Sequence, residues 1–282
     1  MKTTSSLSVI MPALNEENNI ANAIHSTMAS FEKYKIRGDI IVVNDGSTDG
    51  TRTVVERIME SCPNLRLVNH ESREGIGKSF LDGVRNSVMD VVVLLPGDNE
   101  LSAEDTLSFF KIMDHVDIIV PFVHNVEVRE FSRRLISAVY RFIINKSFAL
   151  NLNYTNGSVF YRRCILSSTL AQVKSFGFFY QAELLVRLIR KGYLFAEVPN
   201  FLSLRKSGRS KAISARSLLD VIRCFLRLFV EMNFLRSFSR DPNQSHPDSI
   251  TFKKYHAHVI EDSAAIEETA PIGIRRAGGS NR

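Results

Sequence analysis

Short apolar runs alternate with helical periodicity along the first third of the chain. Four runs consist mainly of branched aliphatic side chains, as in strands buried on both faces of a sheet. They cover residues 7–11, 39–43, 65–68 and 91–95. Between them, apolar residues recur at three- and four-residue spacing, which predicts helices over residues 20–31, 51–60 and 77–86. This alternation predicts an α/β fold with a doubly wound, mostly parallel sheet.

The rest of the chain continues with strands and longer helices. Apolar runs predict strands over residues 117–121 and 195–198, and periodic segments predict helices over residues 129–149 and 181–191. Beyond Arg240 the sequence becomes polar. We therefore expect one folded domain over residues 1–236, ending in a basic amphipathic helix, and a polar, disordered tail over residues 237–282.

The composition is that of an ordinary globular enzyme. The 282 residues, of which 44% are hydrophobic, suffice for a sizeable core. No apolar run approaches the length of about 20 residues that a membrane span needs, and the polar first residues do not resemble a secretory signal. The three cysteines are far apart in sequence and lack zinc-ligand spacing, so we expect reduced thiols in a cytoplasmic protein.

Positive charge is concentrated in one segment. The net charge is +6, and residues 202–240 carry nine basic against two acidic side chains, a local charge of +7. Such a patch calls for an anionic partner, such as ligand phosphates, a membrane surface or nucleic acid.

An acidic cluster follows the strand predicted over residues 91–95. Gly97 ends the run, and Asp98 and Glu100 come directly after it. Ligands of open α/β sheets bind at the carboxyl ends of strands, and paired carboxylates suit a hard divalent cation. Acidic turns of this kind are also common as solvated loops. The cluster gains weight from the loops that follow the first two strands.

Those two loops carry side chains suited to a nucleotide. Parallel pairing would place the loop from Pro12 to Glu17 beside the loop from Asn44 to Thr51, with Asp45 positioned for a base or a ribose hydroxyl. Each loop has a simpler explanation, because Glu16 could favour a helix N-terminus and Asp45 could belong to a turn before a helix cap. Together with the acidic cluster, the loops favour nucleotide binding.

Four motifs in order resemble those of the inverting family 2 glycosyltransferases, most closely the dolichyl- and polyprenyl-phosphate sugar synthases. They are residues 8–17 (SVIMPALNEE), 42–49 (VVNDGSTD), 75–79 (GIGKS) and 96–100 (PGDNE). The resemblance covers about residues 7–211. It implies a GT-A-type nucleotide-diphospho-sugar transferase fold and a GDP- or UDP-linked sugar, not a nucleic acid, as partner. The donor-binding residues it implies are Pro12, Leu14, Glu16, Asp45, Lys78, Gly97, Asp98, Arg205 and Lys211.

The resemblance also implies Mg²⁺ or Mn²⁺ at the acidic motif, held by Asp98 and Glu100. The family typically carries Asp-x-Asp at this motif, but Pro96 stands in place of the first Asp. Loss of one carboxylate should weaken metal binding without preventing it, because phosphate and water oxygens supply other ligands. A non-catalytic nucleotide-sugar-binding module is therefore one alternative to an active enzyme.

Arg133, Arg134 and Glu183 bear on the acceptor, and Arg134 and Glu183, together with Asp98, are the candidate catalytic residues. Arg133 and Arg134 fall where the resembled branch places arginines for an acceptor phosphate. A lipid phosphate, with a second pKa near about 6, is already nucleophilic at neutral pH. A saccharide hydroxyl, as in surface-glycan synthesis, would instead need a base, and Glu183 is the candidate. Glu183 could equally face solvent or pair with Arg187 one helical turn away.

The basic helix predicted over residues 216–236 is compatible with two surroundings. Its apolar side chains around Arg223 and Arg227 would suit an anionic membrane surface, or they could pack on the core. We expect a glycosyltransferase that moves a sugar to a polyprenyl phosphate with inversion, peripheral on the cytoplasmic face of a membrane.

Overall fold

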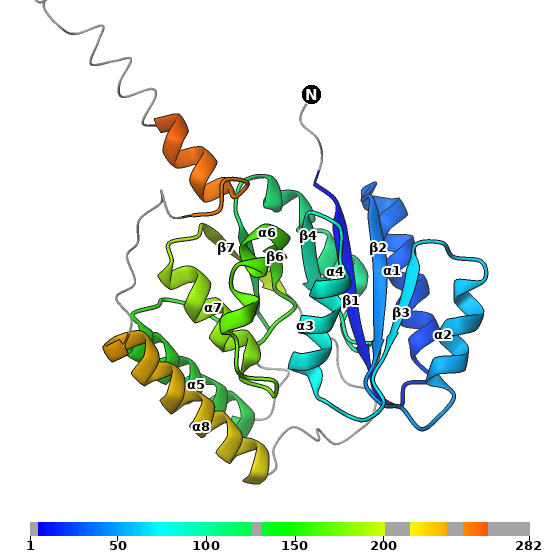
Figure 1. Ribbon diagram of the computed structural model, residues 1–282, viewed down its shortest axis with the longest axis horizontal. Coiled ribbons are helices and arrows are strands. Elements are labelled where there is room, and N and C mark those ends of the chain that lie inside the picture. Colours follow the sequence, from blue (N-terminus) through cyan, green and yellow to red (C-terminus); the bar gives the residue numbers. More distant parts are fainter. Residues whose placement is uncertain (1–4, 126–130, 201–214, 236–244, 259–282) are drawn as a thin grey trace, which may run out of the picture.

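The structure is a computed structural model, and it describes residues 5–125, 131–200, 215–235 and 245–258. Within this part, seven strands form one sheet in the order β3-β2-β1-β4-β6-β5-β7 (Figure 1). All neighbours are parallel except β6, which runs antiparallel to β4 and β5. The α/β fold with a mostly parallel sheet is therefore confirmed. The strands are β1 (Leu7–Ala13), β2 (Gly38–Asn44), β3 (Leu65–Asn69), β4 (Val91–Leu94), β5 (Ile118–Val123), β6 (Phe160–Arg162) and β7 (Phe195–Asn200).

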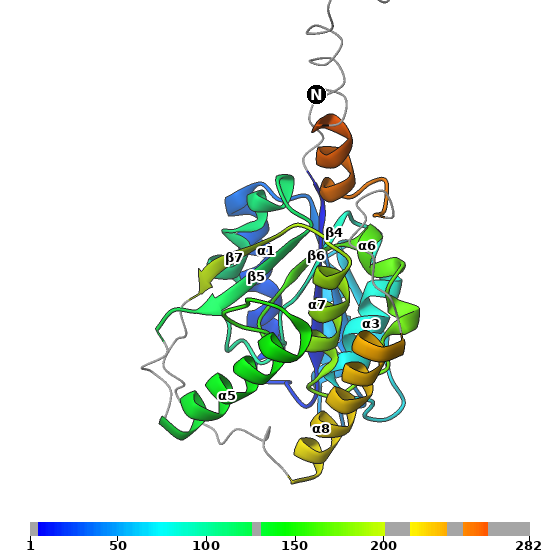
Figure 2. The same ribbon diagram turned by 90° about the vertical axis from the view of Figure 1, so that its left-hand side faces the viewer.

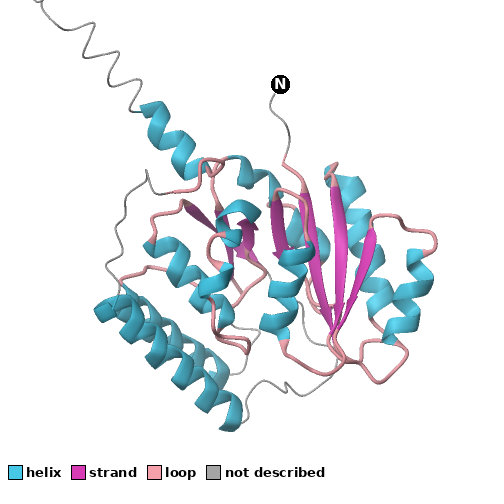
Figure 3. Ribbon diagram, viewed as in Figure 1, coloured by secondary structure: helices cyan, strands magenta, loops and turns pink. Residues whose placement is uncertain are grey.

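Helices cover both faces of the sheet (Figure 3). One face packs against α1, α2 and α4, and the other against α3, α6 and α7. The helices are α1 (Ile20–Tyr34), α2 (Thr51–Met59), α3 (Ile76–Asn86), α4 (Ala103–Leu107), α5 (Phe131–Phe148), α6 (Arg163–Ser167), α7 (Tyr180–Arg190) and α8 (Ala215–Val230). Short 3₁₀ turns span Phe110–Asp114 and Leu170–Gln172, and a π-turn, Glu231–Leu235, continues α8.

Strand β1 is longer than the sequence predicts. The run over residues 7–11 predicts an end at Met11, before Pro12, but pairing with β2 continues through Ala13. The pairing of β1 with β4 stops at Ile10, so the missing amide hydrogen of Pro12 faces the side on which the ladder has already ended. The Pro12 carbonyl on that side accepts a hydrogen bond from Gly97 N at 2.9 Å.

Helices α5 and α8 form an additional layer outside α7. They lie at the end of the molecule away from β3 and α2 in Figure 1, and both lie at the bottom of the molecule in Figure 2. Their inner sides join α7 in one apolar cluster, in which the Phe148 ring of α5 lies 5.8 Å from the Phe225 ring of α8. Almost every residue of α7 is buried because this helix is covered from both sides.

The expectation of a disordered tail over residues 237–282 is wrong for residues 245–258. Residues 250–258 form a helix. Its first amides, Ile250 N and Thr251 N, donate to the carboxylate of Asp117 at 2.7 and 2.9 Å. This fully buried carboxylate caps the helix, a contact that the polar sequence did not reveal.

Candidate functional site

Three loops meet at the carboxyl ends of β1, β2 and β4. Strand β1 lies between β2 and β4, so the loops that follow them are neighbours. Asp45 N donates to Ala13 O at 2.9 Å, and Gly97 N donates to Pro12 O at the same distance. The three loops predicted to bind the donor are therefore brought together.

The first two loops are also joined by side chains. Asn15 adopts a left-handed backbone conformation, with φ of 58°, and its side-chain oxygen accepts a hydrogen bond from Thr48 N at 2.8 Å. Glu17 accepts a hydrogen bond from Gly50 N at 2.6 Å. The two loops therefore form one unit whose edge is rich in oxygen atoms.

Asp45 is buried beneath these loops and contacts protein groups. Its carboxylate accepts hydrogen bonds from Glu74 N at 2.8 Å, from Gly75 N at 2.9 Å and from His70 Nδ1 at 2.9 Å. Burial alone would raise the pKa of Asp45, but these hydrogen bonds outweigh burial and hold the pKa below its usual value. Asp45 thus positions residues 74 and 75, where α3 begins, and a contact with the nucleotide stays a prediction.

The lowered pKa of Asp45 makes its contribution dependent on pH. The ionised carboxylate stabilises the fold above its usual pKa of 3.8, and this stabilisation is lost as the pH falls through the lowered folded value. We expect Asp45→Asn to lower the urea midpoint of unfolding at about pH 6, and the difference from the natural protein to shrink towards about pH 3. Urea titrations at both pH values test this, and an undiminished difference in acid would contradict it.

A network that sequence reasoning missed extends from Asp45 to α3. The His70 ring lies between two carboxylates, with Nδ1 2.9 Å from Asp45 and Nε2 3.2 Å from Asp82. Asp82 also pairs with Lys78 and Arg85. Burial would raise the pKa of Asp82, but these two cations lower it. Lys78, predicted to bind the donor, is thus held along α3 beside this network. The position of His70, just after β3, was the available sequence signal.

The acidic residues gather at the same edge. The pKa of Glu16 is raised by burial, and the negative charges of Asp98, Glu100 and Asp49 raise it further. Mutual repulsion of this kind is what a divalent cation offsets, and carboxylate oxygens are suitable ligands. Within the described residues, no group of three or more acidic, His or Cys side chains is placed to hold a metal ion. Metal binding by Asp98 and Glu100 therefore stays a prediction, in which phosphate and water oxygens would have to supply the other ligands.

A cavity of about 240 Å³ lies next to the acidic edge. Leu94 and Pro96 at the end of β4 line one side of it. Tyr180 and Gln181, at the start of α7, line another, and Gln181 donates a hydrogen bond to Gly157 O. Pro96, which replaces the family's first Asp, therefore contributes an apolar wall beside the acidic edge.

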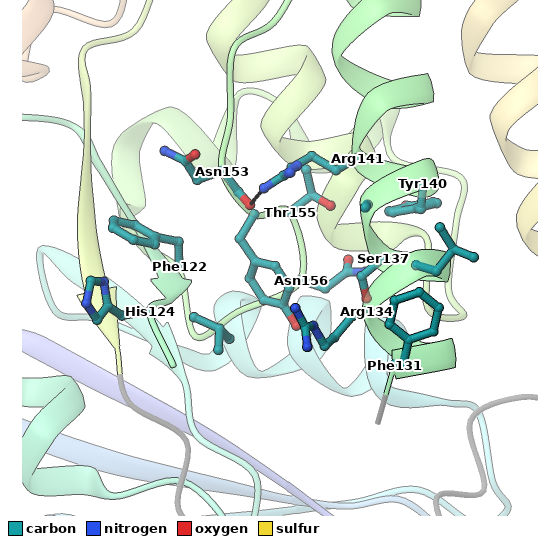
Figure 4. A pocket seen from close by; sticks show the side chains of 14 residues that line it. Phe122, His124, Phe131, Arg134, Ser137, Tyr140, Arg141, Asn153, Thr155 and Asn156 are labelled. Atoms are coloured by element: carbon teal, nitrogen blue, oxygen red, sulfur yellow. Dashed lines mark hydrogen bonds between the residues drawn. The ribbon is translucent and has the colours of Figure 1, made fainter. Parts of the chain in front are cut away.

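A larger cavity of about 500 Å³ adjoins the first, and Figure 4 shows the side chains that line it. The two share lining residues Phe122, Val123, Tyr154 and Asn156. Helix α5 lines the larger cavity with Arg134 and Arg141, among other residues. Arg141 donates to Asn153 O at 3.1 Å. Arg141 was not predicted, although its seven-residue spacing from Arg134 places both arginines on one face of a helix.

Glu183 lies in a buried ion-pair network and lines neither cavity. Its side chain is fully buried and accepts hydrogen bonds from Arg187 Nη2 at 2.7 Å and from Ser175 N at 3.0 Å. Arg187 in turn contacts Glu231 at 2.9 Å, joining α7 to the end of α8. Burial lowers the pKa of Arg187, but Glu231 and Glu183 raise it more.

The chain shares its sequence pattern with a known family. The sequence model of glycosyl transferase family 2 matches residues 8–169, more than half of the chain. The chain belongs to glycosyl transferase family 2. It is thus an enzyme of the hexosyltransferase type, as the sequence predicts.

Individual relatives of the transferase are more distant. It is 27% identical over 231 residues to a polyprenol monophosphomannose synthase of Mycolicibacterium smegmatis, covering 75% of this chain and 82% of that protein. It is 31% identical over 104 residues to a dolichyl-phosphate beta-glucosyltransferase of Trichomonas vaginalis, but this covers only 35% and 32% of the two chains.

Solved structures of similar fold confirm the GT-A-type architecture of the transferase. The glucosyl-3-phosphoglycerate synthase of Mycobacterium tuberculosis in complex with UDP matches with a TM-score of 0.59 at 20% identity, over 80% of each chain. Its complex with Mn²⁺, UDP and phosphoglyceric acid matches with a TM-score of 0.57 at 19% identity, over 80% of this chain and 78% of that chain. At this identity the likeness establishes the fold alone.

Two expectations about Glu183 in the transferase are resolved by its surroundings. The pairing with Arg187 is confirmed, whereas exposure to solvent is wrong. The expectation that Glu183 is a catalytic base does not fit this geometry, because a fully buried carboxylate bound to an arginine cannot contact an acceptor hydroxyl. Its role here is to hold α7 and the residues before it in place.

Glu183→Gln is therefore expected to affect stability more than chemistry. Removing one partner of a buried ion pair should lower the free energy of unfolding by about 3 kcal/mol. The folded variant should lose far less transfer activity than the ~10²–10⁴-fold expected for a missing general base. Glu56→Gln is the matched control, since Glu56 forms an exposed pair with Arg52 in α2 and should cost under about 1 kcal/mol. A stable but inactive Glu183→Gln enzyme would contradict this assignment.

The side chains of three predicted phosphate-binding residues of the transferase are not described. Arg205 and Lys211 belong to residues 201–214, which are not described. Arg133 is in α5, but its side chain is not described. Their roles stay predictions. None of the helices in the described part of the chain is long and apolar enough to cross a bilayer.

Proposed function

We propose that the transferase moves a sugar from a nucleoside diphosphate donor to a polyprenyl phosphate, inverting the anomeric carbon. The observation that carries this proposal is the pair of adjoining cavities, one beside the acidic edge and one lined by Arg134 and Arg141. The larger cavity combines these cations with apolar and aromatic side chains such as Phe122 and Phe131, which suits a phosphate attached to a hydrocarbon chain. The two relatives are named a polyprenol monophosphomannose synthase and a dolichyl-phosphate beta-glucosyltransferase, and these names support the same acceptor class.

The donor would occupy the edge where the three loops meet. Its base would lie between the Pro12 loop and the Asp45 loop, and its sugar would extend into the smaller cavity beside Pro96. The remaining donor contacts would come from Leu14, Glu16, Gly97 and the cations Lys78, Arg205 and Lys211. Cations there would offset the negative charge that develops on the departing diphosphate.

Asp98 and Glu100 would hold Mg²⁺ or Mn²⁺ at this edge. When bound, the ion would offset negative charge on the diphosphate and reduce the repulsion that raises the pKa of Glu16. Because Pro96 supplies no carboxylate, the protein provides few ligands, and the donor's own phosphates would complete the site. This arrangement makes metal and donor binding mutually dependent.

The acceptor phosphate needs no protein base. One of its oxygens attacks the anomeric carbon as the bond from that carbon to the diphosphate oxygen breaks, and the electron pair leaves with the nucleoside diphosphate. The attack comes from the face opposite the leaving group, so the configuration inverts. Arg134 would hold the phosphate for this attack, and the burial of Glu183 is consistent with a nucleophile that is already ionised.

A donor screen tests the proposal. The protein is incubated with Mn²⁺ and each of several GDP- and UDP-linked sugars, with and without polyprenyl phosphate, and nucleoside diphosphate release is measured. We expect one donor to give release that rises strongly when polyprenyl phosphate is present. Release that never depends on polyprenyl phosphate would contradict the proposed acceptor, and donor binding without any release would favour a non-catalytic nucleotide-sugar-binding module.

A further inference from the structure

Helices α5 and α8 expose an unusually apolar surface, which we name the α5/α8 face. Its large hydrophobic side chains are 43–75% exposed. On each helix they are adjacent or recur at intervals of three or four residues, so they form one stripe per helix. They are Phe131, Leu135, Ile136, Val139, Phe142 and Ile143 on α5, and Leu218, Leu219, Ile222, Leu226 and Val230 on α8, followed by Phe234 and Leu235.

The two stripes point away from the core. The opposite side of α5 is buried through Ile144 and Phe148, and the opposite side of α8 through Cys224 and Leu228, all against α7. Packing on the core, the alternative expected for α8, is thus satisfied by its inner side and leaves the outer side exposed. A contiguous exposed apolar patch formed by the stripes of two neighbouring helices marks an interaction surface.

Cations accompany the apolar stripes. On α5, Arg134, Arg141 and Lys146 are exposed, and the helix contains no Asp or Glu. On α8, Arg223 is exposed. Of the acidic residues of α8 and its π-helix, Glu231 is buried against Arg187, and Asp220, although exposed, lies beside Gly177 and Cys224 on the inner side of α8. An apolar surface edged by cations is complementary to anionic lipid headgroups over an apolar interior.

We propose that the α5/α8 face docks onto an anionic lipid bilayer and that the larger cavity opens on this docking face. The position of the cavity opening is inferred from Phe131 and Leu135, which are exposed on the face and also line the cavity that contains Arg134. This deepens the proposed function, on which the second part rests: a polyprenyl phosphate could present its headgroup to Arg134 while its hydrocarbon chain stays in the bilayer.

A second copy of the chain fits this face less well. A two-fold contact through the face would set the cations that edge it in one copy near the same cations of the other copy. Because α5 has cations and no acidic residue, such a contact would oppose like charges without a partner to neutralise them. Lipid phosphates neutralise the same cations.

Sedimentation with vesicles tests docking on the full chain. The vesicles consist of phosphatidylcholine with about one-third phosphatidylglycerol, and pure phosphatidylcholine vesicles serve for comparison. We expect binding to the anionic vesicles that weakens as salt rises, since charge attraction is screened over about 10 Å at 0.1 M. Ile136→Glu and Leu219→Glu, at positions 57% and 67% exposed, should each lower the partition coefficient about 10- to 100-fold.

Val88→Glu is the matched control. Val88 is 67% exposed, like Leu219, but lies before β4 and outside the α5/α8 face, so this variant should bind vesicles as the natural protein does. Equal loss in all three variants, or no vesicle binding at low salt, would overturn the proposal, as would a dimer in solution that Leu219→Glu dissociates.

Enzymatic transfer separates docking from the proposed function. With a short-chain, water-dispersed polyprenyl phosphate, Leu219→Glu should transfer sugar at the natural rate, while its transfer to long-chain acceptor in vesicles should fall in step with binding. Vesicle binding without any transfer would refute the proposed function and leave docking intact. Equal losses with both acceptors would refute the link between the face and the cavity.

Discussion

Asp98→Ala is expected to abolish Mn²⁺-dependent binding of a nucleoside diphosphate and to lower the transfer rate by at least about 100-fold. The family typically carries a carboxylate at both of the positions that Pro96 and Asp98 occupy here. Asp98 therefore supplies the only carboxylate of these two positions. With so few ligands from the protein, the site cannot compensate for the loss of this one. Glu100→Ala should have a milder effect, because Glu100 is more exposed than Asp98.

Calorimetric titration of nucleoside diphosphate, with and without Mn²⁺, measures this effect. Glu104→Ala is the control, because Glu104 lies nearby in sequence on α4 but pairs with Lys33 at the surface. Metal-stimulated binding that persists undiminished in Asp98→Ala would show that the metal, if any, is held elsewhere.

Arg134→Ala is expected to reduce kcat/KM for polyprenyl phosphate roughly 100-fold while leaving donor binding unchanged. Arg134 lines the larger cavity and is exposed there, so its guanidinium is available to a phosphate. The donor is proposed to bind on the other side of the shared lining residues, near Pro96. Loss of Arg134 should therefore affect acceptor binding alone.

Steady-state rates at varied acceptor concentration, with donor affinity measured separately, test this expectation. Arg57→Ala is the matched control, because Arg57 is an exposed arginine on α2 that lines neither cavity and lies outside the α5/α8 face, and this variant should stay close to the natural rate. If Arg134→Ala were nearly normal and a folded Glu183→Gln were inactive, the acceptor would be a hydroxyl and the lipid-phosphate proposal would be wrong.

The first four strands and their loops could be predicted because their signals are local. Each buried strand of a parallel sheet is a continuous apolar run, and each following loop carries its polar residues within a few positions. Parallel pairing then places the loops after β1, β2 and β4 together without further information. The main error in this region, the end of β1, arose because Pro12 lacks a hydrogen-bond donor only on the side where β4 no longer pairs.

Other features depend on contacts distant in sequence. The burial of Glu183 depends on Arg227, 44 positions away, and on its partner Arg187, which pairs with Glu231, also 44 positions further on. The helix of residues 250–258 depends on Asp117, more than 130 positions away. The larger cavity combines β5, α5 and residues 153–156, none of which has a distinctive motif. Local periodicity carries no information about such partners, so only Arg134, placed by family resemblance, was identified in advance.

The most direct measurement is the identity of the product formed from labelled nucleotide sugar, Mn²⁺ and a mixture of polyprenyl phosphate and free saccharide acceptors. The two-cavity arrangement predicts a lipid-extractable sugar joined to the polyprenyl chain through a single phosphate, with the anomeric configuration opposite to that of the donor. Phosphorus and proton NMR of the purified product establish both the linkage and the configuration. A water-soluble saccharide product, with polyprenyl phosphate unchanged, would contradict the account.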